Sequence, residues 1–176
     1  MANSVRYTLN KTKYLNPPEA DRLTHILDTY IDENPRDIMM IYLALKTGAR
    51  ATEILNLKAE DLNSYDQTVF IKGIKNSNDR EIPIQHKLFR RLESLPQAED
   101  GSLFPICYHR LRQIWELYRP CHKKFHGLRH TFAINLYKKT KDIRLVQVAL
   151  GHRNITNTMI YAEYVYSTQE LKKAIL

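Results

Sequence analysis

Residues 68–84 read TVFIKGIKNSNDREIPI, and here the hydrophobic pattern of the chain becomes strand-like. The runs at 68–71 and 80–84 are short and carry Val and Ile, and a polar, basic segment at 72–79 separates them. This pattern predicts an antiparallel hairpin with a polar tip. On both sides of it, apolar residues recur every three or four positions, which is typical of amphipathic helices.

The helix boundaries are marked by capping residues. Asn16-Pro-Pro-Glu19 combines an Asn N-cap, Pro in the first turn and a Glu that can complete a capping box. Asn34-Pro35 separates the first two helices, and Gly48 and Gly151 are suited to end later ones. The expected fold class is therefore mainly α with a small antiparallel β-sheet (α+β). The predicted helices cover approximately residues 16–31, 38–47, 51–57, 86–95, 108–118, 126–139, 142–150, 154–164 and 167–176.

Length and composition limit the class of protein. The chain has 176 residues, 43% of them hydrophobic and 26% charged, which suits one globular domain with a real core. Cys107 and Cys121 are its two cysteines, too few for a disulfide-stapled secreted scaffold. No apolar run approaches the roughly 20 residues that span a bilayer. We therefore expect a soluble, intracellular, basic domain without a membrane partner.

The excess positive charge is concentrated in one part of the chain. The formal net charge is +8, but residues 103–161 alone hold eleven Lys and Arg against two Asp and Glu, and five of the seven His. The remaining residues are nearly neutral. Such a stretch favours a polyanionic partner, most commonly nucleic acid, although a solvated basic face is the simpler alternative.

Three local patterns carry candidate chemistry. The segment Thr47-Gly-Ala-Arg50 places an arginine where a turn enters a helix, and His126-Gly-Leu-Arg129-His130 places polar groups on one helical face. Leu150-Gly-His152 is followed nine residues later by Tyr161. In this order and at these distances, the patterns resemble the catalytic domain of the tyrosine recombinases, the phage integrase family, over residues 16–164. The resemblance implies a polar N-terminal arm or linker remnant (1–15), a tyrosine recombinase catalytic domain (16–166) and a C-terminal tail helix (167–176).

The resemblance implies a phosphodiester site. Arg50 and Arg129 match the family arginines, whose guanidiniums can clamp the non-bridging oxygens of one phosphate. Tyr161 matches the nucleophile, which would form a 3′-phosphotyrosyl link and release a 5′-hydroxyl. Tyr164 and Tyr166 are neighbouring alternatives, and the nine-residue interval after His152 favours Tyr161.

The remaining roles follow from the same resemblance. His126 matches a position that assists proton transfer at the tyrosine, and His152 one that hydrogen-bonds the scissile phosphate. Glu53 and His130 match supporting positions. An ordinary ion pair between Arg50 and Glu53, three residues apart on a helix surface, is the structural alternative for this arginine.

The hairpin contains two candidate lysines for the general acid that protonates the leaving 5′-oxygen. Lys75 occupies the family's position when residues are counted back from the second strand, whereas Lys72 is expected to lie in the first strand. We therefore assign this role to Lys75.

A zinc site is an alternative reading of the histidines. His122, His126 and His130 are spaced so that one helix could present all three, with Cys121 beside them. Gly127 and the preceding Arg119-Pro120 interrupt such a helix, and the sequence lacks a His-Glu-x-x-His arrangement. The recombinase resemblance implies no metal and no cofactor.

The function implied is a site-specific DNA recombinase or integrase that cleaves and rejoins strands. Its expected partner is double-stranded DNA with specific recombination sites, bound by a homotetramer whose protomers are monomers when free. The expected location is the cytoplasm of a prokaryote, or of a host of a virus or mobile element. The alternatives are a catalytically silent DNA-binding regulator on the same fold and a type IB topoisomerase-like enzyme that relaxes DNA.

The two ends of the chain leave further alternatives open. The tail helix, through Leu171 and Ile175, could dock on a neighbouring protomer or cap its own domain. The short segment before residue 16 leaves no room for the helical DNA-clamping domain of larger family members. The chain is then either truncated or a naturally short member like the fimbrial-switch invertases.

Overall fold

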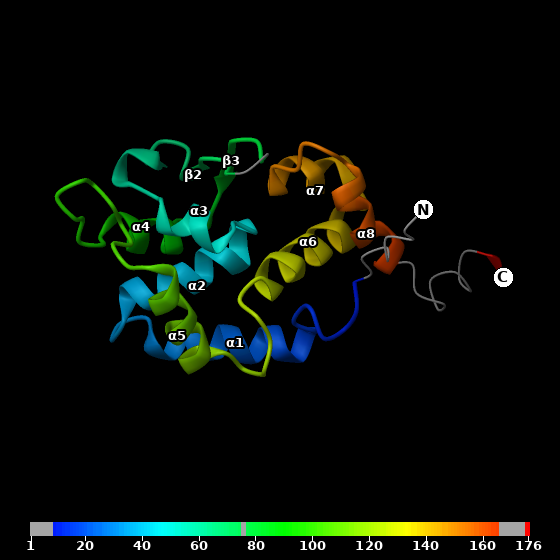
Figure 1. The fold of residues 1–176 in the computed structure, drawn as a ribbon, viewed down its shortest axis with the longest axis horizontal. Helices are drawn as coiled ribbons and strands as arrows, with labels where there is room; N and C mark the ends of the chain where they lie inside the picture. Colours follow the sequence, from blue (N-terminus) through cyan, green and yellow to red (C-terminus); the bar gives the residue numbers. More distant parts are fainter. Residues whose placement is uncertain (1–8, 75–76, 166–174) are drawn as a thin grey trace, which may run out of the picture.

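The computed structural model describes residues 9–74, 77–165 and 175–176, and it has the predicted mainly helical architecture with a small antiparallel sheet (Figure 1). Within these ranges no helix is both long and apolar enough to cross a bilayer. The elements are α1 (Pro17–Tyr30), α2 (Pro35–Thr47), α3 (Ala51–Leu55), η1 (Ala59–Asp61), β1 (Leu62–Asn63), β2 (Thr68–Ile71), β3 (Arg80–Pro83), α4 (His86–Glu93), α5 (Tyr108–Tyr118), α6 (Gly127–Thr140), α7 (Ile143–Leu150) and α8 (Thr156–Val165).

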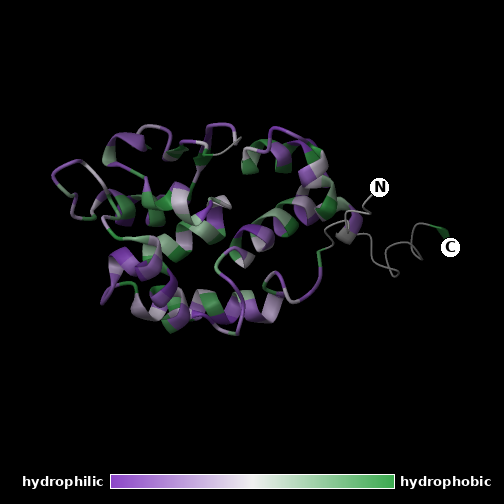
Figure 2. Cartoon of the chain, viewed as in Figure 1, coloured by the Kyte–Doolittle hydropathy of each residue, from purple (hydrophilic) through white to green (hydrophobic). Residues whose placement is uncertain are grey.

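Helix α2 forms the centre of the larger core. Every residue from Ile38 to Leu45 is buried, so this helix is apolar all round rather than amphipathic. It packs against α1, α4, α5 and α6, and Figure 2 shows its hydrophobic residues inside the molecule. Pro35 opens the helix, and Gly48 ends it with a positive φ of 64°. The chain turns after Gly48 and continues into α3.

The sheet has the strand order β1-β2-β3, all antiparallel. The predicted hairpin pairs Thr68 with Pro83 and Val69 with Ile82. Strand β1 was not predicted because two residues carry no periodicity. In β3 the buried positions are Arg80 and Ile82, so an arginine shares the inward face of the sheet.

Helices α6, α7 and α8 surround a second, smaller core. Val146, Tyr137 and Tyr161 are buried there, together with Leu9 and Tyr14 from the N-terminal segment. Residues 9–15 of the predicted polar arm therefore pack onto the helices. The predicted tail helix lies outside the described residues, apart from residues 175 and 176.

A glycine at the end of α7 brings the hairpin against the helices. Gly151 has a φ of 69°, and a Cβ there would lie 2.6 Å from the Asn78 carbonyl oxygen, closer than a side chain permits. Its own carbonyl accepts hydrogen bonds from Asn78 N (2.8 Å) and Ser77 Oγ (2.9 Å). The end of the hairpin loop is thus held beside His152, the next residue.

Candidate active site

Six of the eight predicted site residues line one pocket of about 380 Å³. It lies where the start of α3, the first turn of α6, the segment after α7 and the first half of α8 meet. Glu53 lies behind its wall, and Lys75 lies outside the described residues. The residues that line the pocket are Arg50, His126, Arg129, His130, His152, Asn157, Ile160 and Tyr161.

Arg50 is held by a buried carboxylate. Its backbone N and its Nη1 donate to Glu53 Oε2 (2.7 Å) and Oε1 (2.9 Å), and Nη1 also donates to Ser77 Oγ (2.9 Å). The ion pair that was the structural alternative for Arg50 is therefore present. This ion pair does not remove Arg50 from the pocket, because the Arg50 side chain is 31% exposed while Glu53 is fully buried.

Glu53 binds a second arginine that the sequence did not single out. Arg80 Nη2 and Nη1 donate to Glu53 Oε2 (2.7 Å) and Oε1 (3.3 Å), a forked geometry between two buried groups. Burial alone raises the pKa of Glu53, but the Arg80 hydrogen bonds and charge, with further contributions from the Arg50 backbone and Arg129, outweigh it and hold the pKa below its ordinary value. The carboxylate is therefore charged and can fix the position of Arg50.

Arg129 is almost completely buried at the base of the pocket. Nη1 donates to the Gly48 carbonyl (2.6 Å) and Nη2 to the Leu150 carbonyl (2.8 Å), so the guanidinium joins the ends of α2 and α7. Burial, together with the positive charges of Arg50 and Arg80, lowers its pKa to about 9. Arg129 therefore stays cationic at neutral pH, and it lines the same pocket as Arg50.

Tyr161 lies in the pocket wall and is 2% exposed. Its hydroxyl is 3.0 Å from His130 Nδ1. His126 meets His130 edge to face, with 4.8 Å between ring centroids. The histidine in hydrogen-bond contact with the tyrosine is thus His130, to which the resemblance gives a supporting role, and the role of His126 remains a prediction.

The helix start explains this arrangement. Helix α6 begins at Gly127, one residue later than predicted, with His126 as its N-cap. His130 is therefore directed inward from the first turn, while His126 is exposed at the mouth of the pocket. The pKa of His126 lies below its ordinary value because of desolvation and the charges of Arg129 and Arg50.

His152 is fixed by a residue on α8. Its Nδ1 is 2.9 Å from Thr158 Oγ1, and Thr158 is completely buried. This bond leaves Nε2 as the nitrogen available to a ligand. Burial and the charges of Arg129, Arg50 and Arg80 lower the pKa of His152 to about 3, so the ring is neutral at pH 7.

These buried histidines predict how stability depends on pH. Burial and the neighbouring charges of His126 and Arg129 also lower the pKa of His130 to about 3, against roughly 6.5 in an unfolded chain. At pH 5 the unfolded chain binds a proton at this position and the folded chain does not, so the free energy of unfolding rises with pH over this range. His130 is expected to contribute about 2 kcal/mol to the loss of stability between pH 7.5 and pH 5.

Urea denaturation at both pH values tests this expectation. The variant His130→Asn should reduce the difference between the two free energies of unfolding by that amount. His25→Asn, which changes an exposed histidine on α1, is the matched control and should leave the difference as in the wild type. An unchanged difference in His130→Asn would contradict the prediction.

The hairpin lysines differ in their surroundings. Lys72 Nζ contacts Asp61 Oδ1 (2.9 Å) and Glu60 Oε1 (3.3 Å), so it is held on the carboxylates that follow α3. Lys75 lies outside the described residues, between Gly73 and Ser77. Ser77, two residues later in the sequence, contacts both Arg50 and Gly151, so this end of the hairpin loop is joined to the pocket wall.

The zinc alternative required His122, His126 and His130 on one helix. Because α6 begins only at Gly127, the first two of these residues precede the helix. In the described part of the chain, no three His, Cys, Asp or Glu side chains are grouped so as to hold a metal ion.

Four residues that line the pocket or hold its side chains were not singled out by sequence reasoning. Arg80 could have been found, because strand alternation places it on the same face as the apolar Ile82. The other three, Ser77, Asn157 and Thr158, carry no signal in the sequence, since their relevance comes only from contacts across the fold.

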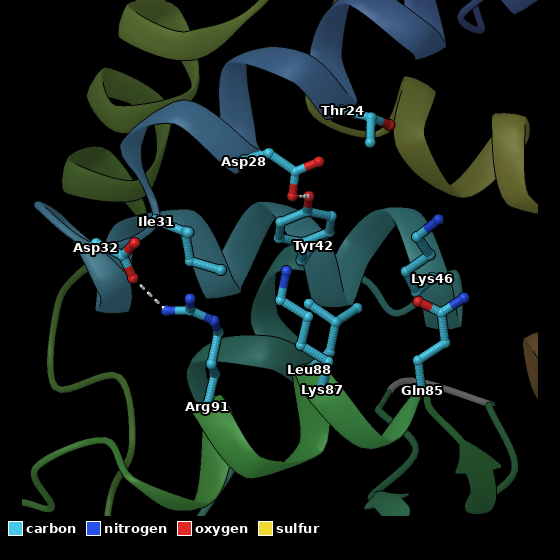
Figure 3. Close-up of a pocket in the computed structure, with 10 residues that line it drawn as sticks. All are labelled: Thr24, Asp28, Ile31, Asp32, Tyr42, Lys46, Gln85, Lys87, Leu88 and Arg91. Carbon is cyan, nitrogen blue, oxygen red and sulfur yellow. Dashed lines mark hydrogen bonds and ion pairs between the residues drawn. The ribbon is translucent and has the colours of Figure 1, made fainter.

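A second pocket, of about 300 Å³, lies between α1, α2 and α4 (Figure 3). Two hydrogen bonds cross it, from Tyr42 Oη to Asp28 (2.6 Å) and from Arg91 Nη1 to Asp32 (2.6 Å). The first joins α1 to α2, and the second joins the turn after α1 to α4. None of the predicted site residues lines this pocket.

The fold and the pocket define the class of protein. Residues 13–167 match the model of the phage integrase family, and the chain belongs to this family. It is similar to the tyrosine recombinase XerA of Pyrococcus horikoshii, with 31% identity over 93% of this chain and 60% of the relative. It is also similar to the integrase of Escherichia phage 186, with 36% identity over 71% of this chain and 37% of the relative. The chain thus spans about 60% or less of the length of these relatives.

Solved structures show the same fold. The XerH site-specific recombinase, in a pre-cleavage complex with its difH substrate, has a TM-score of 0.70 and 26% identity over 96% of this chain and 55% of that one. The catalytic domain of bacteriophage HP1 integrase has a TM-score of 0.66 and 25% identity, covering 92% of this chain and 94% of that domain. The described fold therefore corresponds to a catalytic domain of this family.

Proposed function

We propose that this chain is the catalytic domain of a site-specific DNA recombinase or integrase that cleaves and rejoins strands through a covalent 3′-phosphotyrosine. The main support for this proposal is the pocket, which is lined by Tyr161 together with Arg50 and Arg129. A phenol near two cations is suited to attack a phosphodiester, because the cations stabilise both the anionic substrate and the phenolate.

The two arginines bind the non-bridging oxygens of the scissile phosphate. Glu53 holds Arg50 in place, and the Gly48 and Leu150 carbonyls hold Arg129. Both guanidiniums are therefore in position before DNA binds. Fixed donors of this kind stabilise the charge that grows on the equatorial oxygens in the transition state. Neutral His152 adds a hydrogen bond from Nε2 to the same phosphate.

In the cleavage step, Tyr161 Oη forms a bond to phosphorus while the bond from phosphorus to the 5′-oxygen breaks. The phenol proton leaves toward the histidine pair, where His130 Nδ1 is the nearest acceptor and His126 assists. The departing 5′-oxygen takes a proton from Lys75. Rejoining is the reverse, with a 5′-hydroxyl attacking the phosphotyrosine.

The role of Lys75 predicts a chemical rescue. Lys75→Ala should slow cleavage of ordinary DNA on the order of 100-fold or more, as expected for the loss of a general acid. A substrate with a 5′-thio leaving group should restore most of this rate, because a thiolate leaves without protonation. Lys72→Ala is the control, since Lys72 is paired with Asp61. If the sulfur substrate does not rescue Lys75→Ala, the general acid is another residue.

The proposed partner is double-stranded DNA carrying specific recombination sites. The basic stretch at residues 103–161 and the DNA complex of XerH support this partner. On DNA, four protomers are proposed to assemble and exchange strands in two pairs, with free protomers monomeric. Archaeal, bacterial and phage relatives support action in the cytoplasm of a prokaryote.

Covalent capture on DNA tests the activity. The wild-type chain is incubated with a library of nicked suicide duplexes of randomised sequence, from which the short fragment that carries the free 5′-hydroxyl diffuses away. Denaturant-resistant adducts linked through a 3′-phosphate are expected, and sequencing of the captured strands identifies the site. DNA binding without any adduct would favour the silent regulator, and rapid relaxation of any supercoiled plasmid would favour the topoisomerase-like enzyme.

A further inference from the structure

Asn157 belongs to the pocket but has no role in the chemistry described above. It lies in the second position of α8, one turn before Tyr161, and lines the pocket together with both arginines. The next residue, Thr158, is turned inward to His152. In the ranges that the structure describes, the Asn157 carboxamide makes no hydrogen bond.

Most other polar side chains of the pocket already have a hydrogen bond within the protein. Arg129 donates to two backbone carbonyls, Arg50 donates to Glu53 and Ser77, and His130 contacts Tyr161. Side chains four residues apart on a helix have Cβ atoms about 5–6 Å apart, so a phosphate attacked by Tyr161 is within reach of the Asn157 amide. A neutral amide here can donate to an anion, and it carries no negative charge that would pair with the arginines in place of the phosphate.

We propose that Asn157 is a further substrate-contacting residue, which donates a hydrogen bond from Nδ2 to a non-bridging oxygen of the scissile phosphate on the side from which Tyr161 attacks. The inference rests on the proposed function. Asn157 exchanges no proton in the step. Its hydrogen bond strengthens as negative charge accumulates on the phosphate oxygens, which lowers the barrier for cleavage and for rejoining alike.

Single-turnover cleavage of a duplex recovered from the suicide library tests the contact. Asn157→Ala is expected to slow the formation of the adduct on the order of 10- to 100-fold, the typical effect of losing a hydrogen bond to a charged group. Asn157→Asp should be slower still, because its carboxylate has nearly the same shape as the amide and repels the phosphate. Aspartate in the first turn of α8 favours the helix, so the slower cleavage does not arise from a weakened helix.

The matched control adds the same charge outside the pocket. Asn154 lies three residues earlier, is exposed, and accepts a hydrogen bond from Thr156 N (2.9 Å) that an aspartate preserves. Asn154→Asp should cleave like the wild type.

A neutral substrate separates contact with the phosphate from other effects. When a methylphosphonate replaces the scissile phosphate, the additional penalty of Asn157→Asp over Asn157→Ala should shrink, because the repelling charge is absent. An equal penalty on both substrates, or wild-type cleavage by both variants, overturns the inference while leaving the proposed function intact. A wild-type chain that forms no adduct overturns the proposed function and the inference together.

Discussion

Tyr161→Phe is expected to abolish the covalent adduct completely. The substitution removes the oxygen proposed as the nucleophile and keeps the ring, which packs in the core of α6, α7 and α8. DNA binding should persist, because Arg50 and Arg129 are held by groups other than Tyr161. The hydrogen bond to His130 is lost, which should cost about 1 kcal/mol of stability. Adduct formation on the suicide duplex and DNA binding, measured side by side, check this expectation.

The neighbouring tyrosine provides the matched control. Tyr164→Phe removes an equivalent oxygen from the same helix and should retain adduct formation. Mass spectrometry of the wild-type adduct, after digestion, should locate the nucleotide on the peptide that contains Tyr161. An adduct formed by Tyr161→Phe, or a nucleotide found on Tyr164 or Tyr166, would show that the nucleophile is another residue.

Glu53→Ala is expected to lower the free energy of unfolding by about 3–5 kcal/mol, the typical cost of breaking a buried ion pair. Arg80 would be left as an unpaired charge with a 2% exposed side chain, and Arg129, whose Nη1 is 4.0 Å from Glu53 Oε2, would lose a compensating charge. Arg50 would lose the carboxylate that holds its backbone and its guanidinium. Cleavage should therefore fall as well. Urea denaturation gives the change in stability.

Two variants separate the buried pair from ordinary surface charge. Glu60→Ala removes an exposed carboxylate that pairs with Lys72, and it should change the free energy of unfolding by about 1 kcal/mol or less. Replacing both Glu53 and Arg80 by Leu should recover part of the stability, because the buried charge of Arg80 is removed together with its partner. A loss below about 1 kcal/mol in Glu53→Ala would contradict the assignment of a buried ion pair.

Much of the fold could be predicted because its signals are local. The capping box of Asn16 and Glu19 is present at the start of α1, and α5 has the predicted bounds. The hairpin pairs its two predicted strands. Helix α2 was predicted as amphipathic and is buried on all sides, because burial depends on α1, α4, α5 and α6 packing around it.

Most residues of the site could be predicted from the sequence, but the contacts between them could not. Spacing along the chain brought Arg50, Arg129, His152 and Tyr161 to attention, and all four line one pocket. Spacing could not indicate that His130 rather than His126 contacts the tyrosine, since this depends on α6 starting at Gly127. It also could not reveal that Arg80 pairs with Glu53, which lies 27 residues away.

The sequence by itself therefore determined the family, the types of residue proposed for the chemistry, and the helices and hairpin that carry these residues. These are properties of short segments, whose caps, periodicity and spacing act within a few residues. Only the tertiary structure decided how the charges are compensated. Glu53 joins Arg50 to Arg80, two carbonyls hold Arg129, Thr158 fixes His152, and Asn157 is left facing the pocket. The physical reason is that a buried charge is stable only beside its partner, and the partners here come from segments that meet only when the chain has folded.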